Sequence, residues 1–275
     1  MRLAVFGNKG YLGSQLEFWF SGRNHAVAGF DLPECDVSDQ AFWRSFRPSD
    51  YDAILFFSGL TGTEKSFDGA ESFLSVNELG LLGLLRTLAP LGKSSPKVVF
   101  PSTRLVFKGS ASPLREDDPK ETKTPYAVNK LACEGYLSAF GNRYGIPYAV
   151  LRICVPFGSL VPGGSSYGTV GFFERAAAGG KPIPLYGGGS VRRTFTHVRD
   201  VCAAVETLAV SGSGAYNLGG EDLSLREAAL RIAAKHGVGV VDVPWPAADA
   251  IVESGSTVFD GTKLAQLMEE THAAR

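Results

Sequence analysis

The sequence has few cysteines and no long apolar run. Its four cysteines are widely spaced and form no Cys-x-x-Cys pair, so neither a disulfide framework nor a metal site is expected. No apolar run approaches the roughly 20 residues of a membrane helix, and Gly7 comes too early for the apolar core of a signal peptide. These absences predict a soluble, cytoplasmic protein with reduced thiols.

A charge excess of either sign is also missing. The 27 Lys and Arg residues are balanced by 28 Asp and Glu residues, which leaves a net charge of -1. A chain without a basic excess has little attraction for a nucleic acid or an anionic membrane surface, so neither is expected as a partner. The 275 residues, 44% of them hydrophobic, are enough for a large core in one or two domains.

What the first 155 residues do contain is an alternation of apolar runs with stretches of helical spacing. We expect helices over residues 11–24, 38–50 (with Ser38 as its N-cap), 70–92 and 125–141. We expect strands over residues 2–7, 25–31, 51–59, 97–103 and 147–155. This alternation is typical of α/β proteins with a doubly wound parallel sheet covered on both faces.

The alternation weakens after Val155. Residues 156–169 are rich in glycine and are expected to form loops. Helical spacing returns over 172–180, 198–210 and 224–237, with a strand expected over 214–220. We therefore divide the chain into a Rossmann-type domain, residues 1–155, and a smaller mixed α/β portion, residues 156–275, that binds substrate and returns some segments to the main sheet.

A glycine-rich turn, GNKGYLG, connects the first expected strand to the first expected helix. Its glycines, Gly7, Gly10 and Gly13, permit a tight turn, close approach of a pyrophosphate and close packing of helix on strand. The N–H groups that begin the helix can bind the phosphates. The turn predicts a dinucleotide cofactor, with Lys9, Tyr11 and Leu12 also beside it.

Asp31 ends the second expected strand and bears on the choice of dinucleotide. A carboxylate at this place accepts hydrogen bonds from the adenosine ribose and repels a 2′-phosphate, which favours NAD. Lys9 has the opposite effect, because its ammonium could hold a 2′-phosphate. The sequence thus favours NAD and leaves NADP open.

Two further clusters carry reactive side chains. Ser102 and Thr103 end a strand, where open α/β sheets bind their ligands. Tyr126 and Lys130 lie four positions apart and share one face of a helix. An ammonium near a phenol lowers its pKa from the ordinary value of about 10, so we expect Lys130 to make Tyr126 a better acid/base.

These motifs, taken in order, resemble the extended short-chain dehydrogenase/reductases, the NAD-dependent epimerase/dehydratase family. Besides the glycine turn and the YxxxK spacing, the resemblance rests on four short segments. They are DV (36–37), STRLVFKG (102–109), RRTFTHVRDV (192–201) and AYNLGG (215–220). The resemblance covers nearly the whole chain.

The resemblance implies roles for individual residues. Thr103, Tyr126 and Lys130 would be catalytic, with Lys130 also on the nicotinamide ribose, and Arg193 would bind the substrate's diphosphate. His197 would be structural. The cofactor site would also include Asp36, Val37, Phe57, Ser58, Gly59 and Asn77. Members of the family often dimerise through the helix that bears the tyrosine, so a homodimer is expected.

Several departures narrow the chemistry. Arg104 and Leu105 replace the Asp-Glu pair of the 4,6-dehydratases, and Val155 replaces the asparagine of typical epimerases. The segments LTGTEKS (60–66) and REDDP (115–119) resemble the dTDP-4-dehydrorhamnose reductase subfamily, which implies that Thr61 and Ser102 face the sugar with Thr103. We expect reduction of a 4-keto-6-deoxy nucleotide sugar; the alternatives are a 4-epimerase and a non-catalytic dinucleotide-binding protein.

Overall fold

The main sheet lies at the centre of the computed structural model, which describes residues 1–274. Its six strands are all parallel and run in the order β2-β1-β3-β4-β5-β9. Their bounds are β1 Arg2–Phe6, β2 Ala26–Phe30, β3 Ala53–Phe56, β4 Lys97–Thr103, β5 Tyr148–Ile153 and β9 Gly214–Asn217. This confirms the predicted Rossmann-type sheet.

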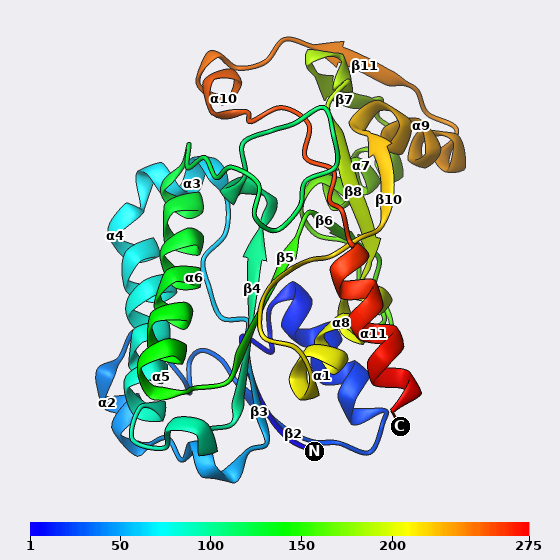
Figure 1. The fold of residues 1–275 in the computed structure, drawn as a ribbon. Coiled ribbons are helices and arrows are strands. Elements are labelled where there is room, and N and C mark those ends of the chain that lie inside the picture. The colour runs from blue at the N-terminus through cyan, green and yellow to red at the C-terminus, as the bar shows by residue number, and fades with distance from the viewer. Residues whose placement is uncertain (275) are drawn as a thin grey trace.

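Helices cover both faces of the sheet (Figure 1). One face carries α1 (Tyr11–Ser21), α8 (Val198–Val210) and α11 (Thr262–Ala273); the other carries α2 (Gln40–Ser45), α5 (Gly80–Leu88) and α6 (Pro125–Tyr144). In β1, Leu3 and Val5 pack toward the first group, whereas Ala4 and Phe6 pack toward the second. Because both faces are buried, the strands are apolar at successive positions rather than alternately.

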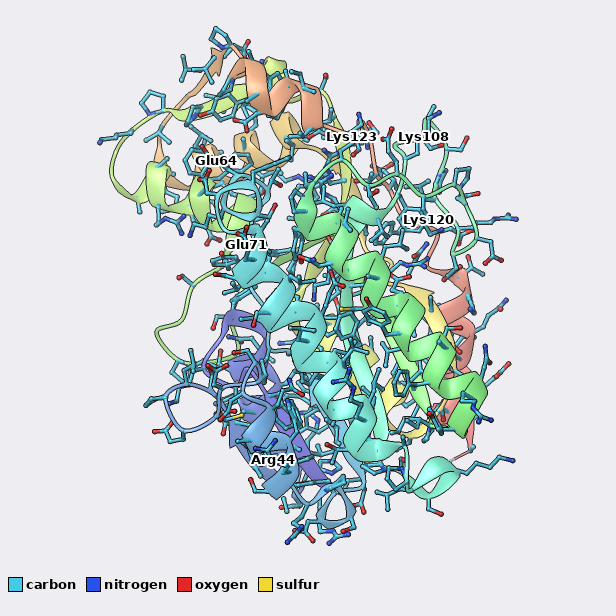
Figure 2. The ribbon with its side chains drawn as sticks, turned by 90° about the vertical axis from the view of Figure 1, so that its left-hand side faces the viewer. Arg44, Glu64, Glu71, Lys108, Lys120 and Lys123 are labelled. Carbon is cyan, nitrogen blue, oxygen red and sulfur yellow. The ribbon has the colours of Figure 1, made fainter. Side chains whose placement is uncertain are left out.

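The helical details differ from the expectation in two places. Residues 70–92 form α4 (Ala70–Phe73), a π-helical segment (η2, Leu74–Leu79) and then α5. Helix α2 is capped by Asp39, which accepts from the Ala41 N–H at 2.8 Å, and not by Ser38, whose hydroxyl donates to Asp36. Figure 2 shows α4 and α5 beside α6, with Glu71 on α4 and Lys123 just before α6 begins.

A smaller lobe stands over the carboxyl ends of the main strands (Figure 1). Its strands form two small sheets, β10-β8-β6 and β11-β7. The bounds are β6 Val155–Phe157, β7 Ile183–Tyr186, β8 Arg192–His197, β10 Glu221–Ser224, β11 Val240–Val243, α7 Gly168–Ala178, α9 Leu225–His236 and α10 Ala247–Val252. Strands β6, β7, β8, β10 and β11 and helices α3 (Thr63–Asp68), α10 and α11 were not predicted, and residues 156–157, which were expected in a loop, belong to β6. Strand β8, RRTFTH, alternates apolar and polar residues too weakly to be recognised.

The remaining elements are short. They are α3 (Thr63–Asp68) and the 3₁₀ turns η1 Pro48–Asp50, η3 Gly92–Ser94, η4 Arg104–Val106 and η5 Gly187–Gly189. The main sheet receives β9 from beyond residue 155, and α8 and α11 pack on its face. Within residues 1–274, the longest helices are too short or too polar to cross a bilayer.

Candidate active site

A cavity of about 410 Å³ opens where β1, β3, β4 and β5 end. The predicted site residues that line it are Gly7, Gly10, Tyr11, Leu12, Gly13, Phe57, Gly59, Thr61, Ser102, Thr103, Tyr126 and Lys130. The fold therefore brings the glycine turn, the end of β4 and the start of α6 to one place. We call this space the first cavity.

The glycine turn packs α1 tightly against the ends of β1 and β3. Gly7 has φ +80°, and a side chain there would come within 2.7 Å of the Ser58 nitrogen. A side chain at Gly13 would come within 1.9 Å of the Gly7 oxygen. Gly10, the N-cap of α1, has no side chain to cap the helix, which leaves the first N–H groups of α1 beside the cavity. This arrangement fits the pyrophosphate of a dinucleotide.

Asp31, directly after β2, turns toward the same glycine turn. Its carboxylate accepts from the backbone N–H groups of Lys9, at 2.9 Å, and Leu32, at 2.8 Å. The Lys9 ammonium points away to Glu34, at 2.9 Å, and the Leu32 carbonyl, at 2.6 Å. Lys9 therefore already has an anionic partner. Glu34 was not predicted, because an exposed glutamate in a loop carries no motif.

Other predicted cofactor residues lie behind the cavity wall. Both amide atoms of Asn77 bind the backbone of Leu60, at 2.7 Å and 3.1 Å, and only 2% of Asn77 is exposed. The side chain of Asp36 binds Ser38, and the carbonyl of the buried Val37 accepts from the Trp43 indole. Ser58 lies against Gly7. Contact between these four residues and the cofactor remains a prediction.

The Tyr–Lys pair occupies the first turns of α6. Thr124 caps this helix by accepting from the Ala127 N–H at 3.1 Å, and Pro125 occupies its first position. The Lys130 ammonium, which is buried, donates to the Pro101 carbonyl at 2.8 Å and lies 5.9 Å from the ring centre of Tyr126. Thr103 ends the neighbouring strand β4 and faces the same space.

Burial dominates the acid–base properties of this pair. It raises the pKa of Tyr126 to about 12, against a smaller lowering by hydrogen bonding with the Thr103 hydroxyl. Burial also lowers the pKa of Lys130 to about 8. The net pKa of Tyr126 is therefore raised by desolvation of the phenolate, and the expected lowering of this pKa by Lys130 stays a prediction. A raised pKa of Tyr126 keeps its phenol protonated at neutral pH.

Ser102 has a structural partner as well as a place in the cavity lining. Its hydroxyl donates to Glu134 at 2.5 Å. Glu134 is also held by Arg152 in a two-point ion pair, at 3.0 and 2.6 Å, with both side chains at least nine-tenths buried. The end of β4, which carries Thr103, is thereby tied to α6 and β5. Whether Ser102 also contacts substrate remains a prediction.

Arg193 lies apart from the first cavity. It lines a second cavity of about 360 Å³ in the smaller lobe, together with Arg104 and Glu253. Only 2% of Arg193 is exposed, and burial lowers its pKa to about 10. His197 is structural, as expected: its ring accepts from the Arg199 N–H at 3.1 Å and packs on Phe157.

Comparison with known proteins decides the family. The model of the NAD dependent epimerase/dehydratase family matches residues 3–219. The chain belongs to this family. The cofactor of the family is NAD, and the glycine turn with Asp31 provides a fitting site for it.

The curated relatives that align with this chain are named for different reactions. A dTDP-glucose 4,6-dehydratase of Xanthomonas campestris pv. campestris is 27% identical over 67% of this chain, which spans 55% of that relative's length. A UDP-glucose 4-epimerase of Mycolicibacterium smegmatis is also 27% identical, over 89% of this chain and 85% of the relative. The resemblance extends to solved structures: the Thermus thermophilus UDP-glucose 4-epimerase in complex with NAD has TM-score 0.83 and 26% identity, covering 100% of this chain and 94% of that one.

Several residues that line the first cavity were not predicted. They are Pro101, Ile153, Cys154, Pro156 and Tyr167. The Tyr167 hydroxyl lies 3.4 Å from that of Thr61, so the two side chains meet across the cavity. A tyrosine inside the glycine-rich segment 156–169 was the available signal. Cys154 gave none, because a lone cysteine after a buried strand is usually a packing residue.

Proposed function

We propose that the protein is an NAD(H)-dependent oxidoreductase of a nucleotide-activated sugar, and that it reduces a 4-keto-6-deoxy sugar. The observation that carries the proposal is the meeting of Thr103, Tyr126 and Lys130 with the glycine turn in one cavity. A hydride donor and a proton donor can thus reach one carbonyl group.

The chain's own residues would handle the proton. NADH, when bound, supplies the hydride. Thr103 would hold the substrate oxygen, and Tyr126 would donate its phenolic proton to that oxygen as negative charge develops on it. A pKa of about 12 keeps the phenol protonated before the reaction. Lys130, fixed by Pro101, would stabilise the phenolate that remains.

The arrangement around Asp31 supports NAD over NADP. A 2′-phosphate at this turn would meet the carboxylates of Asp31 and Glu34, while Lys9 is already paired with Glu34. We therefore expect tighter binding of NADH than of NADPH. The same turn without its acidic residues would leave Lys9 free to bind the phosphate.

A 4-epimerase is the second candidate. Two epimerases, from Mycolicibacterium smegmatis and Thermus thermophilus, match this chain over 89% and 100% of its length. The same three residues would serve an epimerase, but the cofactor would return to its starting state after each turnover. Dehydration is disfavoured, because Arg104 and Leu105 stand where the 4,6-dehydratases carry an acidic pair.

A substrate screen separates the two candidates. Nucleotide sugars and their 4-keto-6-deoxy forms would be incubated with the enzyme and NADH, while NADH absorbance and sugar products are both followed. We expect one NADH to be oxidised for each keto sugar consumed. Interconversion of sugars without loss of NADH would instead establish the epimerase.

A further inference from the structure

Helix α6 carries a third ionisable side chain in line with Tyr126 and Lys130. Glu134 follows Lys130 by four positions, as Lys130 follows Tyr126, so the three side chains lie along one face of the helix. Only 10% of the Glu134 side chain is exposed. A carboxylate that is withdrawn from water to this extent is costly unless it is well partnered, and the proposed proton transfer does not use it.

The partners of Glu134 lie on two strands of the main sheet. Its Oε1 atom accepts from the Ser102 hydroxyl at 2.5 Å and from Nε of Arg152 at 3.0 Å, and its Oε2 atom accepts from Nη2 of Arg152 at 2.6 Å. Ser102 precedes Thr103 at the end of β4, and Arg152 belongs to β5. Hydrogen bonds to an ionised group are about twice as strong as neutral ones. Glu134 therefore fixes the helix that bears Tyr126 against the strand that bears Thr103.

The ammonium of Lys130 lies in largely apolar surroundings beside this contact. It donates to the Pro101 carbonyl at 2.8 Å and lies 4.4 Å from the ring centre of Phe100. Burial lowers the pKa of Lys130 to about 8, and the negative charge of Glu134 counteracts part of this lowering. An opposite charge nearby favours the ionised form of a group, so Glu134 helps Lys130 to stay charged near neutral pH.

The other ionisable groups near Lys130 are neutral or act elsewhere. Cys133 raises the pKa of Lys130 only as a thiolate, but burial raises the pKa of Cys133 itself to about 12. Tyr126 is likewise a neutral phenol near pH 8. The carboxylate of Glu78, on η2, affects the pKa of Cys133 and not that of Lys130. Among residues 1–274, Glu134 is thus the ionised carboxylate that acts on Lys130 in this pH range.

We infer that Glu134 is a positioning residue of the active site, which holds Thr103 in place against the tyrosine helix and keeps the ammonium of Lys130 charged. This rests on the proposed function, although the 4-epimerase candidate would need Glu134 in the same way. Misplacement of a catalytic group by about 1 Å can cost about 100-fold in rate. A neutral Lys130 would also leave the phenolate of Tyr126 without a stabilising charge.

The first test follows Lys130 itself and needs no substrate. The side-chain nitrogens of lysine are isotopically labelled, the ammonium signal of Lys130 is identified by its absence from Lys130→Met, and the signal is titrated by NMR. We expect a midpoint near pH 8 in the wild type and a lower midpoint in Glu134→Gln. The midpoint falls because a negative charge is removed and the cation of Arg152 is left uncompensated, and both changes disfavour the ammonium. An unchanged midpoint in Glu134→Gln would overturn the inference.

Two further variants separate the charge of Glu134 from a general effect on the helix. Glu134→Asp keeps the negative charge but shortens the side chain, so it should weaken the bonds to the two strands and leave the midpoint of Lys130 close to that of the wild type. Glu78→Gln is the matched control, because Glu78 is a buried carboxylate that accepts from Asn129 and, at 3.0 Å, from Tyr136 on the same helix. It should leave the midpoint and kcat unchanged. A midpoint that falls equally in Glu78→Gln and Glu134→Gln would refute the specific role of Glu134.

Steady-state kinetics test the positioning. In Glu134→Gln, kcat should fall about 10- to 100-fold while KM hardly changes, and the decline of kcat/KM at high pH should begin at a lower pH than in the wild type. Glu134→Asp, which also serves if Glu134→Gln does not fold, should lower kcat about tenfold without moving that decline. Wild-type kcat in either folded variant would refute the positioning role.

The outcomes separate this inference from the proposed function. A lower Lys130 midpoint in Glu134→Gln, with no reduction of any keto sugar by the wild type, would support the action of Glu134 on Lys130 and refute the reductase. Reduction by the wild type, with the same kcat and the same Lys130 midpoint in Glu134→Gln, would leave the reductase standing and refute the role of Glu134.

Discussion

The two cavities of this protein differ in how many of their polar side chains already have hydrogen-bond or ion-pair partners. In the first, Lys130 binds a carbonyl, Ser102 binds Glu134, and Asn77 holds the loop after β3 from behind. In the second, Arg193 is neutralised by Glu253, but one buried nitrogen of Arg104 has no hydrogen-bond partner among residues 1–274. Catalysis requires groups that are already fixed in position before the substrate binds. An uncompensated charge, in contrast, can attract and select a ligand of opposite charge. We therefore expect catalysis in the first cavity and recognition of the more distant groups of the substrate in the second.

The largest expected effect comes from the proton donor of the first cavity. Tyr126→Phe removes the phenolic hydroxyl and keeps the ring, so kcat should fall about 100- to 10,000-fold. NADH affinity, measured by fluorescence titration, should hardly change.

The matched control for this change is Tyr136→Phe on the same helix, whose hydroxyl donates to Glu78 at 3.0 Å outside the cavity. Its kcat should remain near that of the wild type. Turnover that survives in Tyr126→Phe would show that Tyr126 is not the proton donor. It would also contradict the expectation that the first cavity is the catalytic one.

The second effect concerns stability. It tests whether the buried contacts of Glu134 with Ser102 and Arg152 stabilise the end of β4 beside the first cavity. Glu134→Gln leaves Arg152 buried without its carboxylate and should lower the free energy of unfolding by about 3–5 kcal/mol. Urea denaturation measures this loss. Glu221→Gln breaks an ion pair with Arg231 in which both side chains are more than half exposed, and it should cost less than about 1 kcal/mol. Equal losses of unfolding free energy in the two variants would show that the buried Glu134–Arg152 ion pair contributes no more to stability than an exposed one.

The sequence predicted the first cavity much better than the second. Apolar runs that end in glycine or a hydroxyl residue identify parallel strands, and parallel strands bring their carboxyl ends to one edge of the sheet. Gly7 and Thr103 could therefore be placed together. Tyr126 could be added because it begins the helix that follows the strand ending at Thr103. The second cavity is built from short, partly polar strands such as β8 and from the loop that bears Glu253, which carry no periodic signal. Arg104 was interpreted only as the loss of an acidic pair, because burial and missing partners do not show in a sequence.

A smaller effect is expected at the cofactor end of the first cavity. Replacing Asp31 with Asn and Glu34 with Gln removes two negative charges and frees Lys9 for a 2′-phosphate. The ratio of NADPH to NADH affinity should then rise about tenfold, as for one charge-assisted hydrogen bond gained. Dissociation constants for both cofactors check this. A wild type that already binds NADPH more tightly would contradict the role of Asp31.

The smallest effect is a pH dependence. Burial lowers the pKa of Lys130 to about 8, so its charge is present below that pH and is lost as the pH rises through it. If the ammonium stabilises the phenolate of Tyr126, kcat/KM for reduction should be flat from about pH 6 to 7 and decline above about pH 8. Lys130→Met should be slower throughout and should lack this decline. A decline that persists in Lys130→Met would assign it to another group.

The most direct test of the central claim follows the hydride itself. The enzyme is mixed with NADH in which both hydrogens at C4 of the nicotinamide are deuterium, and with a 4-keto-6-deoxy nucleotide sugar, and the product is analysed by mass spectrometry and NMR. We predict one NADH oxidised per sugar and one deuterium fixed at the former carbonyl carbon. Interconverted sugars with no net oxidation of NADH would contradict the account.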